Sequence, residues 1–216
     1  MKLGSKIDLD NNDKKSNVWF MSDLHYNHVN ILRLNGGRGF QSIDEMNEEI
    51  VKEIKEKVKP EDILFDLGDL IWKESTEDIK VFKSILPKRS YKIIGNHDNL
   101  KNYLSGAWGS TWAGFYDILD VIIKYQGEDI QVTLSHYPIL DWNHRFRGSW
   151  NLHGHSHGNV DMVNIGSGEL RMDIGYDSTI AKKEGSFLIP FQSIYNLMKG
   201  FAGGKSFREW ANEKFG

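Results

Sequence analysis

The sequence predicts an α/β fold of two stacked, mixed β-sheets flanked by helices. In the first half of the chain, apolar runs typical of buried strands alternate with amphipathic helical segments, the pattern of parallel strands joined by helices. In the second half, apolar runs follow one another with few helices between them, which is typical of antiparallel pairing. A chain of 216 residues with 39% hydrophobic content is long enough to bury one such core.

The first residues differ in character from the rest. Residues 1–16 are polar and charged, and they predict a loop or frayed N-terminal extension. We expect ordered structure to begin at Val18, with residues 17–216 forming a single domain. The start at Met1–Ser5 lacks the hydrophobic segment of a secretion signal, and no apolar stretch approaches the ~20 residues of a membrane span. We therefore expect a cytoplasmic protein without a membrane partner.

The first half of the chain is predicted to run strand, helix, strand, helix, strand. Apolar runs at 18–21, 63–66 and 91–94 predict the strands. After the first strand, residues 29–34 predict a short helix, which the glycine-rich stretch 35–39 ends. That stretch lacks the glycine spacing of a phosphate-binding loop.

Two longer amphipathic helices complete this half. The first begins at Ser42, which forms a capping-box pattern with Glu45, and its apolar residues recur every three or four positions as far as Pro60. The second begins at residue 75 or 76 and ends at Leu86, before a proline.

The second half is predicted to be mainly β-structure. Residues 118–125 and 130–134 flank a polar turn at 126–129, as the two strands of a hairpin would. Further strands are predicted at 150–152 and 169–174, and a terminal helix at 206–215 after a flexible lead at 200–204.

Seven of the eight histidines stand in short clusters with Asp, Asn or Ser, and the clusters follow predicted strands. Strand ends are where α/β proteins place their chemistry, so the pattern predicts one buried metal site. Carboxylate, carboxamide and imidazole ligands suit a first-row divalent ion better than an all-oxygen magnesium site. The chain has no cysteine, which excludes thiolate ligands, disulfides and cysteine nucleophiles. The clusters are Asp23-Leu24-His25 with His28, Gly68-Asp69, Gly95-Asn96-His97-Asp98, Ser135-His136-Tyr137, and His153-Gly154-His155-Ser156-His157.

In this order, the five clusters resemble those of the calcineurin-like metallophosphoesterases, over about residues 18–177. The wider run 22–28, with 147–149 and 173–175, is similar to a branch of small bacterial and phage phosphoesterases. The resemblance implies an αββα metallophosphoesterase-like sandwich and two divalent metal ions. Manganese is favoured, with iron, nickel or zinc as alternatives.

The resemblance also implies a ligand set for each ion. Asp69 would bridge the two ions. The first ion would be held by Asp23, His25, Asp69 and His157, and the second by Asp69, Asn96, His136 and His155.

A site of this kind hydrolyses phosphoesters. Two cations about 3.5 to 4 Å apart acidify a bridging water to hydroxide, orient the phosphoryl group and neutralise charge on the in-line transition state. His97 is the candidate general acid, since an alkoxide leaves poorly without a proton donor, and Asp98 is the candidate residue to orient it.

The sequence departs from the family pattern after Asp69. Many phosphatases of the superfamily read Gly-Asp-x-x-Asp-Arg-Gly, where the later Asp orients the catalytic histidine and the Arg binds a terminal phosphate dianion. Here the stretch is Gly68-Asp69-Leu70-Ile71-Trp72-Lys73-Glu74. A monoanionic phosphodiester needs less cationic contact than a dianionic monoester, so the change favours a diester substrate.

Four residues are candidates for substrate contact. Arg145 and Arg147 are either phosphate ligands or solvated surface arginines. For His28 there are three alternatives: it lines the substrate pocket, lies on the surface, or caps the short helix. For Trp72 there are two: it stacks a base or packs against its neighbours.

The net charge of −3, from 27 basic and 30 acidic side chains, disfavours binding of long duplex nucleic acid. We therefore predict a phosphodiesterase acting on a small nucleotide or cyclic nucleotide. A phosphomonoesterase and a non-catalytic binding module on the same scaffold are the alternatives.

Overall fold

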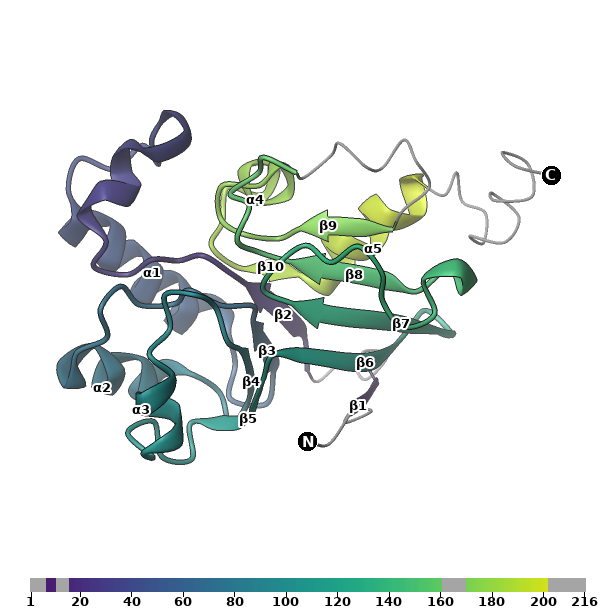
Figure 1. Cartoon of the computed structure of the whole chain (residues 1–216), viewed down its shortest axis with the longest axis horizontal. Coiled ribbons are helices and arrows are strands. Elements are labelled where there is room, and N and C mark those ends of the chain that lie inside the picture. Colours follow the sequence, from purple (N-terminus) through teal and green to yellow (C-terminus); the bar gives the residue numbers. More distant parts are fainter. Residues whose placement is uncertain (1–6, 11–15, 161–169, 202–216) are drawn as a thin grey trace.

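The computed structural model describes residues 7–10, 16–160 and 170–201. Two five-stranded mixed sheets lie against each other, with strand orders β10-β2-β3-β4-β5 and β1-β6-β7-β8-β9, and helices flank them (Figure 1). The predicted fold class is confirmed. In the described residues, no helix has both the length and the apolar character needed to cross a membrane.

The first sheet carries the strands of the first half of the chain. Its parallel strands are β2 (Val18–Met21), β3 (Ile63–Asp66), β4 (Arg89–Ile93) and β5 (Trp112–Tyr116), and β10 (Ile189–Pro190) pairs antiparallel with β2. The helices between them are η1, a 3-10 helix (Val29–Gly36), α1 (Ile43–Lys57), α2 (Thr76–Ile85) and α3 (Leu100–Leu104).

The two long helices begin at the predicted serine caps. The Ser42 hydroxyl accepts from the Glu45 amide at 3.1 Å, but the Glu45 carboxylate accepts from Gln41, so only half of the capping box forms there. Ser75 and Asp78 form the complete reciprocal box at the start of α2.

The second sheet carries the hairpin. Strands β6 (Ile118–Tyr125) and β7 (Glu128–Ser135) pair antiparallel across a two-residue turn, and β8 (Trp150–His153) and β9 (Arg171–Asp173) continue parallel to β7. The predicted hairpin is confirmed. The remaining elements are η2 (Arg145–Arg147), α4 (Thr179–Glu184) and α5 (Phe191–Phe201).

Two expectations about the chain ends need correction. Residues 7–10 form strand β1, which pairs parallel with β6, so ordered structure begins before Val18. Gly200 lies within α5 rather than in a flexible lead, and the rest of that lead and the predicted helix at 206–215 lie outside the described residues.

Two apolar clusters hold the layers together. Side chains from the inner faces of both sheets pack with α5 in one core, where Phe20 stacks on Phe65 with ring centroids 5.2 Å apart. The outer face of the first sheet packs against α1 and α2 in the other, through residues such as Met46 and Phe82. This packing fixes both sheets in one orientation, so the loops that follow β2, β3, β4, β7 and β8 come together at one place.

Candidate metal centre

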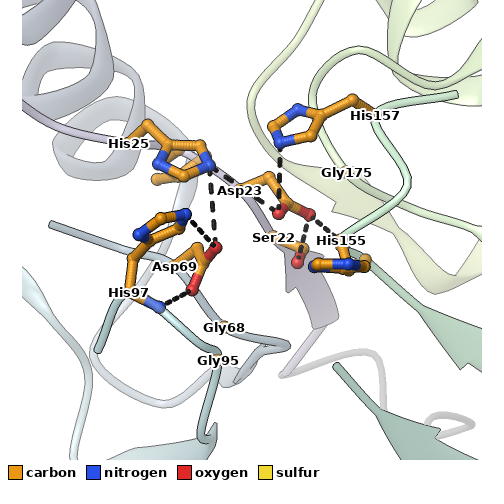
Figure 2. A network of polar contacts seen from close by, with 12 residues as sticks. Ser22, Asp23, His25, Gly68, Asp69, Gly95, His97, His155, His157 and Gly175 are labelled. Atoms are coloured by element: carbon orange, nitrogen blue, oxygen red, sulfur yellow. Dashed lines mark hydrogen bonds and ion pairs between the residues drawn. The ribbon is translucent and has the colours of Figure 1, made fainter. Parts of the chain in front are cut away.

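The first predicted metal position lies between the loop after β2 and the loop after β8. The Asp23 Oδ1 atom is 3.9 Å from the Nε2 atoms of both His25 and His157. Figure 2 shows both imidazole rings directed at the Asp23 carboxylate. Three ligand atoms therefore face one point, although their residues span more than 130 positions of the chain.

Asp69 stands between the two predicted positions. Its Oδ2 atom is 3.7 Å from His25 Nε2 and 3.5 Å from His136 Nε2. Its Oδ1 atom accepts a hydrogen bond from the His97 amide at 2.8 Å, which fixes the carboxylate plane (Figure 2). One oxygen thus faces both groups of ligands, as a bridging carboxylate must.

The second predicted position is formed by three further side chains. The Asn96 Oδ1 atom lies 2.9 Å from both His136 Nε2 and His155 Nδ1. The other ring nitrogen of His136 is 2.8 Å from the Leu67 carbonyl, which orients the ring toward the centre. The structure therefore brings all seven predicted metal ligands together.

The donor set fits divalent cations. Within the described residues, Asp23 Oδ1 and both ring nitrogens of His25 are buried and make no hydrogen bond. Leaving a buried polar atom unsatisfied costs about 1–3 kcal/mol, and a bound cation would remove that cost. The second position adds an amide oxygen and two imidazoles, a mixed set that suits first-row divalent ions.

Burial adjusts the protonation of these ligands. It lowers the pKa of His25 to about 2, aided by the positive charge of Arg38, so the ring is neutral and able to bind a metal. Burial and the nearby Asp173 carboxylate raise the pKa of Asp23 to about 7. A cation must therefore compete with a proton at Asp23.

The backbone at the ligands is unusual. Nine non-glycine residues of the described chain have positive φ, and five of them are predicted ligands. Such conformations are uncommon outside glycine, and they persist where the surrounding structure imposes them. The five are Asp23 (55°), His25 (51°), Asp69 (57°), His155 (65°) and His157 (48°).

Glycines in the clusters allow close approach of the loops. Gly68 has φ +114°, and a side chain there would overlap the His136 ring. A side chain at Gly154 would overlap Ser22 and the Asp23 carboxylate. These glycines therefore let the loops carry ligands into direct contact.

Asp98 has a different role from the predicted one. Its buried carboxylate accepts from the amides of Gly95 at 2.7 Å and Asp69 at 3.1 Å, and it pairs with Lys92 Nζ at 2.9 Å. Lys92 also pairs with Asp66 at 2.7 Å, and all three side chains are buried. Within the described residues, the Asp98 carboxylate thus joins the loops after β3 and β4 through their amides, and the buried Lys92 links it to Asp66.

His97 lies at the open side of the centre. Its ring is 37% exposed, and its Nε2 atom is 3.9 Å from Asp69 Oδ2. The Trp72 ring packs against it at 4.7 Å and stacks on His28 at 3.9 Å with an interplanar angle of 7°. Trp72 stands where the family pattern has the orienting Asp, so in this chain an indole ring rather than a carboxylate packs against His97.

The other two substrate candidates lie elsewhere. Arg145 and Arg147 precede β8, whereas His155 follows it, so the arginines stand at the far end of that strand (Figure 1). Arg145 donates to the Leu140 carbonyl at 2.7 Å and packs over Trp142. This position does not support the expected phosphate contact.

Sequence reasoning missed several residues around the centre. Asp66 ends the apolar strand β3, and Lys92 stands between aromatic and apolar residues of β4, a signal that could have identified a buried ion pair. Tyr137 was quoted with His136 but given no role. This residue is 49% exposed, and its ring centroid lies 4.4 Å from that of His155.

Comparison with known proteins identifies the class. The family described as calcineurin-like phosphoesterases matches residues 16–171, and the chain belongs to that family. Membership assigns it to the metal-dependent phosphoester hydrolases.

Individual relatives span much of the chain. An uncharacterized protein of Methanocaldococcus jannaschii is 30% identical over 143 residues, covering 66% of this chain and 70% of the relative. The gene 66 protein of Mycobacterium phage D29 is 26% identical over 164 residues, covering 67% and 80%. The crystal structure of a protein of unknown function from Aquifex aeolicus superposes with a TM-score of 0.60 at 25% identity, covering 84% of this chain and 99% of that one.

Proposed function

We propose that this protein is a two-metal phosphodiesterase that acts on a small nucleotide or cyclic nucleotide. The observation that carries the proposal is the meeting of seven candidate ligand side chains, Asp69 among them, with His97 beside them. Manganese is the favoured ion by family resemblance. When bound, the ions supply an activated water and neutralise charge on the phosphoryl group.

The residues of the chain supply the remaining functions. His97 donates a proton to the leaving oxygen, since it is accessible to solvent and its Nε2 atom faces the centre. The Asp69 carboxylate holds the amide of His97 and thereby places the acid next to the metal ligands. Trp72 restricts the orientation of the His97 ring.

The preference for a diester rests on the stretch after Asp69. In place of the family's Asp and Arg, the chain has Trp72 and the exposed Lys73, whose Nζ lies 5.9 Å from the Trp72 ring. A lysine offers a point charge rather than the paired donors of an arginine, which is a weaker contact for a phosphate dianion.

A small nucleotide suits the surroundings of the centre. One face of Trp72 is occupied by His28, so the exposed ring of Tyr137, which lies beside His155, is the better surface for a base. The chain's slight negative charge favours a small substrate over a long nucleic acid.

The test compares two model esters with manganese present. We expect faster turnover of bis(p-nitrophenyl) phosphate than of p-nitrophenyl phosphate, and His97→Ala should slow the diester reaction about 10²- to 10⁴-fold. His144→Ala is the control, because His144 lies in the loop before β8. A preference for the monoester would replace the proposal with a phosphomonoesterase. Binding of a nucleotide without turnover of any ester would replace it with a binding module.

A further inference from the structure

Arg38 reaches the back of the metal centre from the glycine-rich stretch that the sequence analysis left without a function. Its side chain is completely buried. The guanidinium donates to two successive carbonyls of the loop after β2, from Nη2 to Asp23 at 2.7 Å and from Nη1 to Leu24 at 2.8 Å. Arg38 therefore holds the backbone of a predicted ligand that has a left-handed conformation.

The same guanidinium contacts the opposite wall of the centre. It forms a two-point pair with the Asp177 carboxylate, at 3.1 Å from Nε to Oδ1 and 2.7 Å from Nη2 to Oδ2. Asp177 Oδ2 in turn lies 2.7 Å from His157 Nδ1. A carboxylate on one ring nitrogen fixes the tautomer and directs the other nitrogen to the metal, and His157 Nε2 faces Asp23 Oδ1.

These contacts connect both walls of the first metal position. Asp23 and His157 come from different sheets, and Arg38 touches the first directly and the second through Asp177. We infer that Arg38 is a positioning residue that sets the distance between these two ligands. The inference rests on the proposed two-metal centre, and it adds a residue that lies outside the five sequence clusters.

An arginine is required for this geometry. A planar guanidinium presents donors along two edges, so it can bind a carboxylate with two parallel bonds while donating to carbonyls on another side. A lysine has a single nitrogen and cannot span both walls. The Tyr176 ring packs over the guanidinium, with Cζ 4.9 Å from the ring centroid, and holds its plane.

Two variants test the inference by metal binding alone. Arg38→Lys keeps the charge but loses the planar fork, and Asp177→Asn keeps the shape but weakens the link to His157. The matched control is Arg33→Lys, because Arg33 is exposed on η1, just before the glycine-rich stretch. Mn²⁺ is titrated into metal-stripped protein by calorimetry, and two dissociation constants are fitted for each variant.

We expect one dissociation constant to rise about 10- to 100-fold in both variants and the other to stay unchanged. In a His155→Ala background, where the second position lacks a ligand, the remaining constant should rise by the same factor. The two changes should also be non-additive when combined, since they act through one path. Wild-type constants in both variants, or weakening of only the second position, would overturn the inference.

The thermal unfolding midpoint of each metal-free variant shows whether it folds. If Arg38→Lys does not fold, the result for Asp177→Asn decides alone, because asparagine preserves the size and shape of the aspartate side chain. The readout is independent of the proposed function. A wild-type protein that binds two ions but cleaves no ester would reject the phosphodiesterase and leave the role of Arg38 intact.

Discussion

Asp69 is the residue on which both metal positions depend. Its Oδ2 atom faces His25 on one side and His136 on the other, while its second oxygen is occupied by the His97 amide. A carboxylate in this position supplies negative charge to two cations at once.

Substitution of Asp69 should therefore lower the metal content of the protein, whereas substitution of His97 should leave it unchanged. Asp69→Asn removes the shared charge, and we expect both ions to bind more weakly. His97→Ala removes the acid but no ligand, so both ions should remain while turnover falls. Metal analysis after dialysis checks both variants, and loss of metal from His97→Ala would contradict its role as an acid.

Metal binding at the first position should depend on pH. Because the pKa of Asp23 is raised to about 7, this carboxyl is protonated below that pH in the metal-free protein and must release its proton to a cation. Burial alone would lower the pKa of His157, but its hydrogen bond to Asp177 and the negative charges of Asp23 and Asp177 together raise it, which adds to the release.

We therefore expect Mn²⁺ affinity to rise up to about pH 7 and to level off above it. Below pH 7 the affinity should fall about tenfold for each pH unit and each proton displaced. Calorimetry in buffers with different ionisation enthalpies counts the protons released. We expect release of at least one proton per ion at pH 6 and of fewer at pH 8. Equal or smaller release at pH 6 would show that the ligands are already ionised there.

The candidate metal ligands could be named from the sequence because they stand in short clusters that follow strands and resemble the clusters of a known family. The residues that hold these ligands in place could not be predicted from the sequence. Arg38 acts on the carbonyls of Asp23 and Leu24, and backbone groups carry no sequence signal. Asp98 was paired with His97 because they are neighbours in sequence, but its charged partner Lys92 lies on strand β4.

At the level of the secondary-structure elements, strand β4 contains a buried lysine that pairs with two carboxylates. Lys92 is completely buried between Asp66 on β3 and Asp98 in the loop that follows β4. Burial alone would lower the pKa of Lys92, but the two carboxylates raise it above its usual value, so the ammonium stays charged. This ion group ties two parallel strands together directly below the ligand loops.

Removing Lys92 should be costly. Lys92→Met leaves two buried carboxylates without their counter-charge, and we expect a loss of about 3–5 kcal/mol in the free energy of unfolding. Lys124→Met, at an exposed position on β6, is the control and should change it by less than about 0.5 kcal/mol. Urea unfolding of the metal-free proteins measures both. A loss below about 1 kcal/mol for Lys92→Met would mean that the pair is not an important support.

Several elements could not be predicted for physical reasons. Strand β1 has only four residues, two of them Asp, and it exists because β6 lies beside it more than 100 positions later. Strand β5 is an edge strand with alternating exposure and an internal glycine, which is a weak pattern. In contrast, α1 and α2 have caps and an apolar face within their own sequence, so local reasoning found them.

At the scale of the whole molecule, the centre exists only when the two sheets are joined. Loops of the first sheet supply Asp23, His25, Asp69 and Asn96, and loops of the second supply His136, His155 and His157. The apolar core between the sheets sets the distance between these two groups. The fold thus links hydrophobic packing to the assembly of a metal site.

The most direct test of this account adds Mn²⁺ stepwise to metal-stripped protein and follows hydrolysis of bis(p-nitrophenyl) phosphate. A two-metal hydrolase should be inactive without metal and reach its full rate only when two equivalents are bound per chain. Full activity with one equivalent of Mn²⁺ bound, or activity after complete removal of metal, would show that a two-metal centre does not perform the reaction.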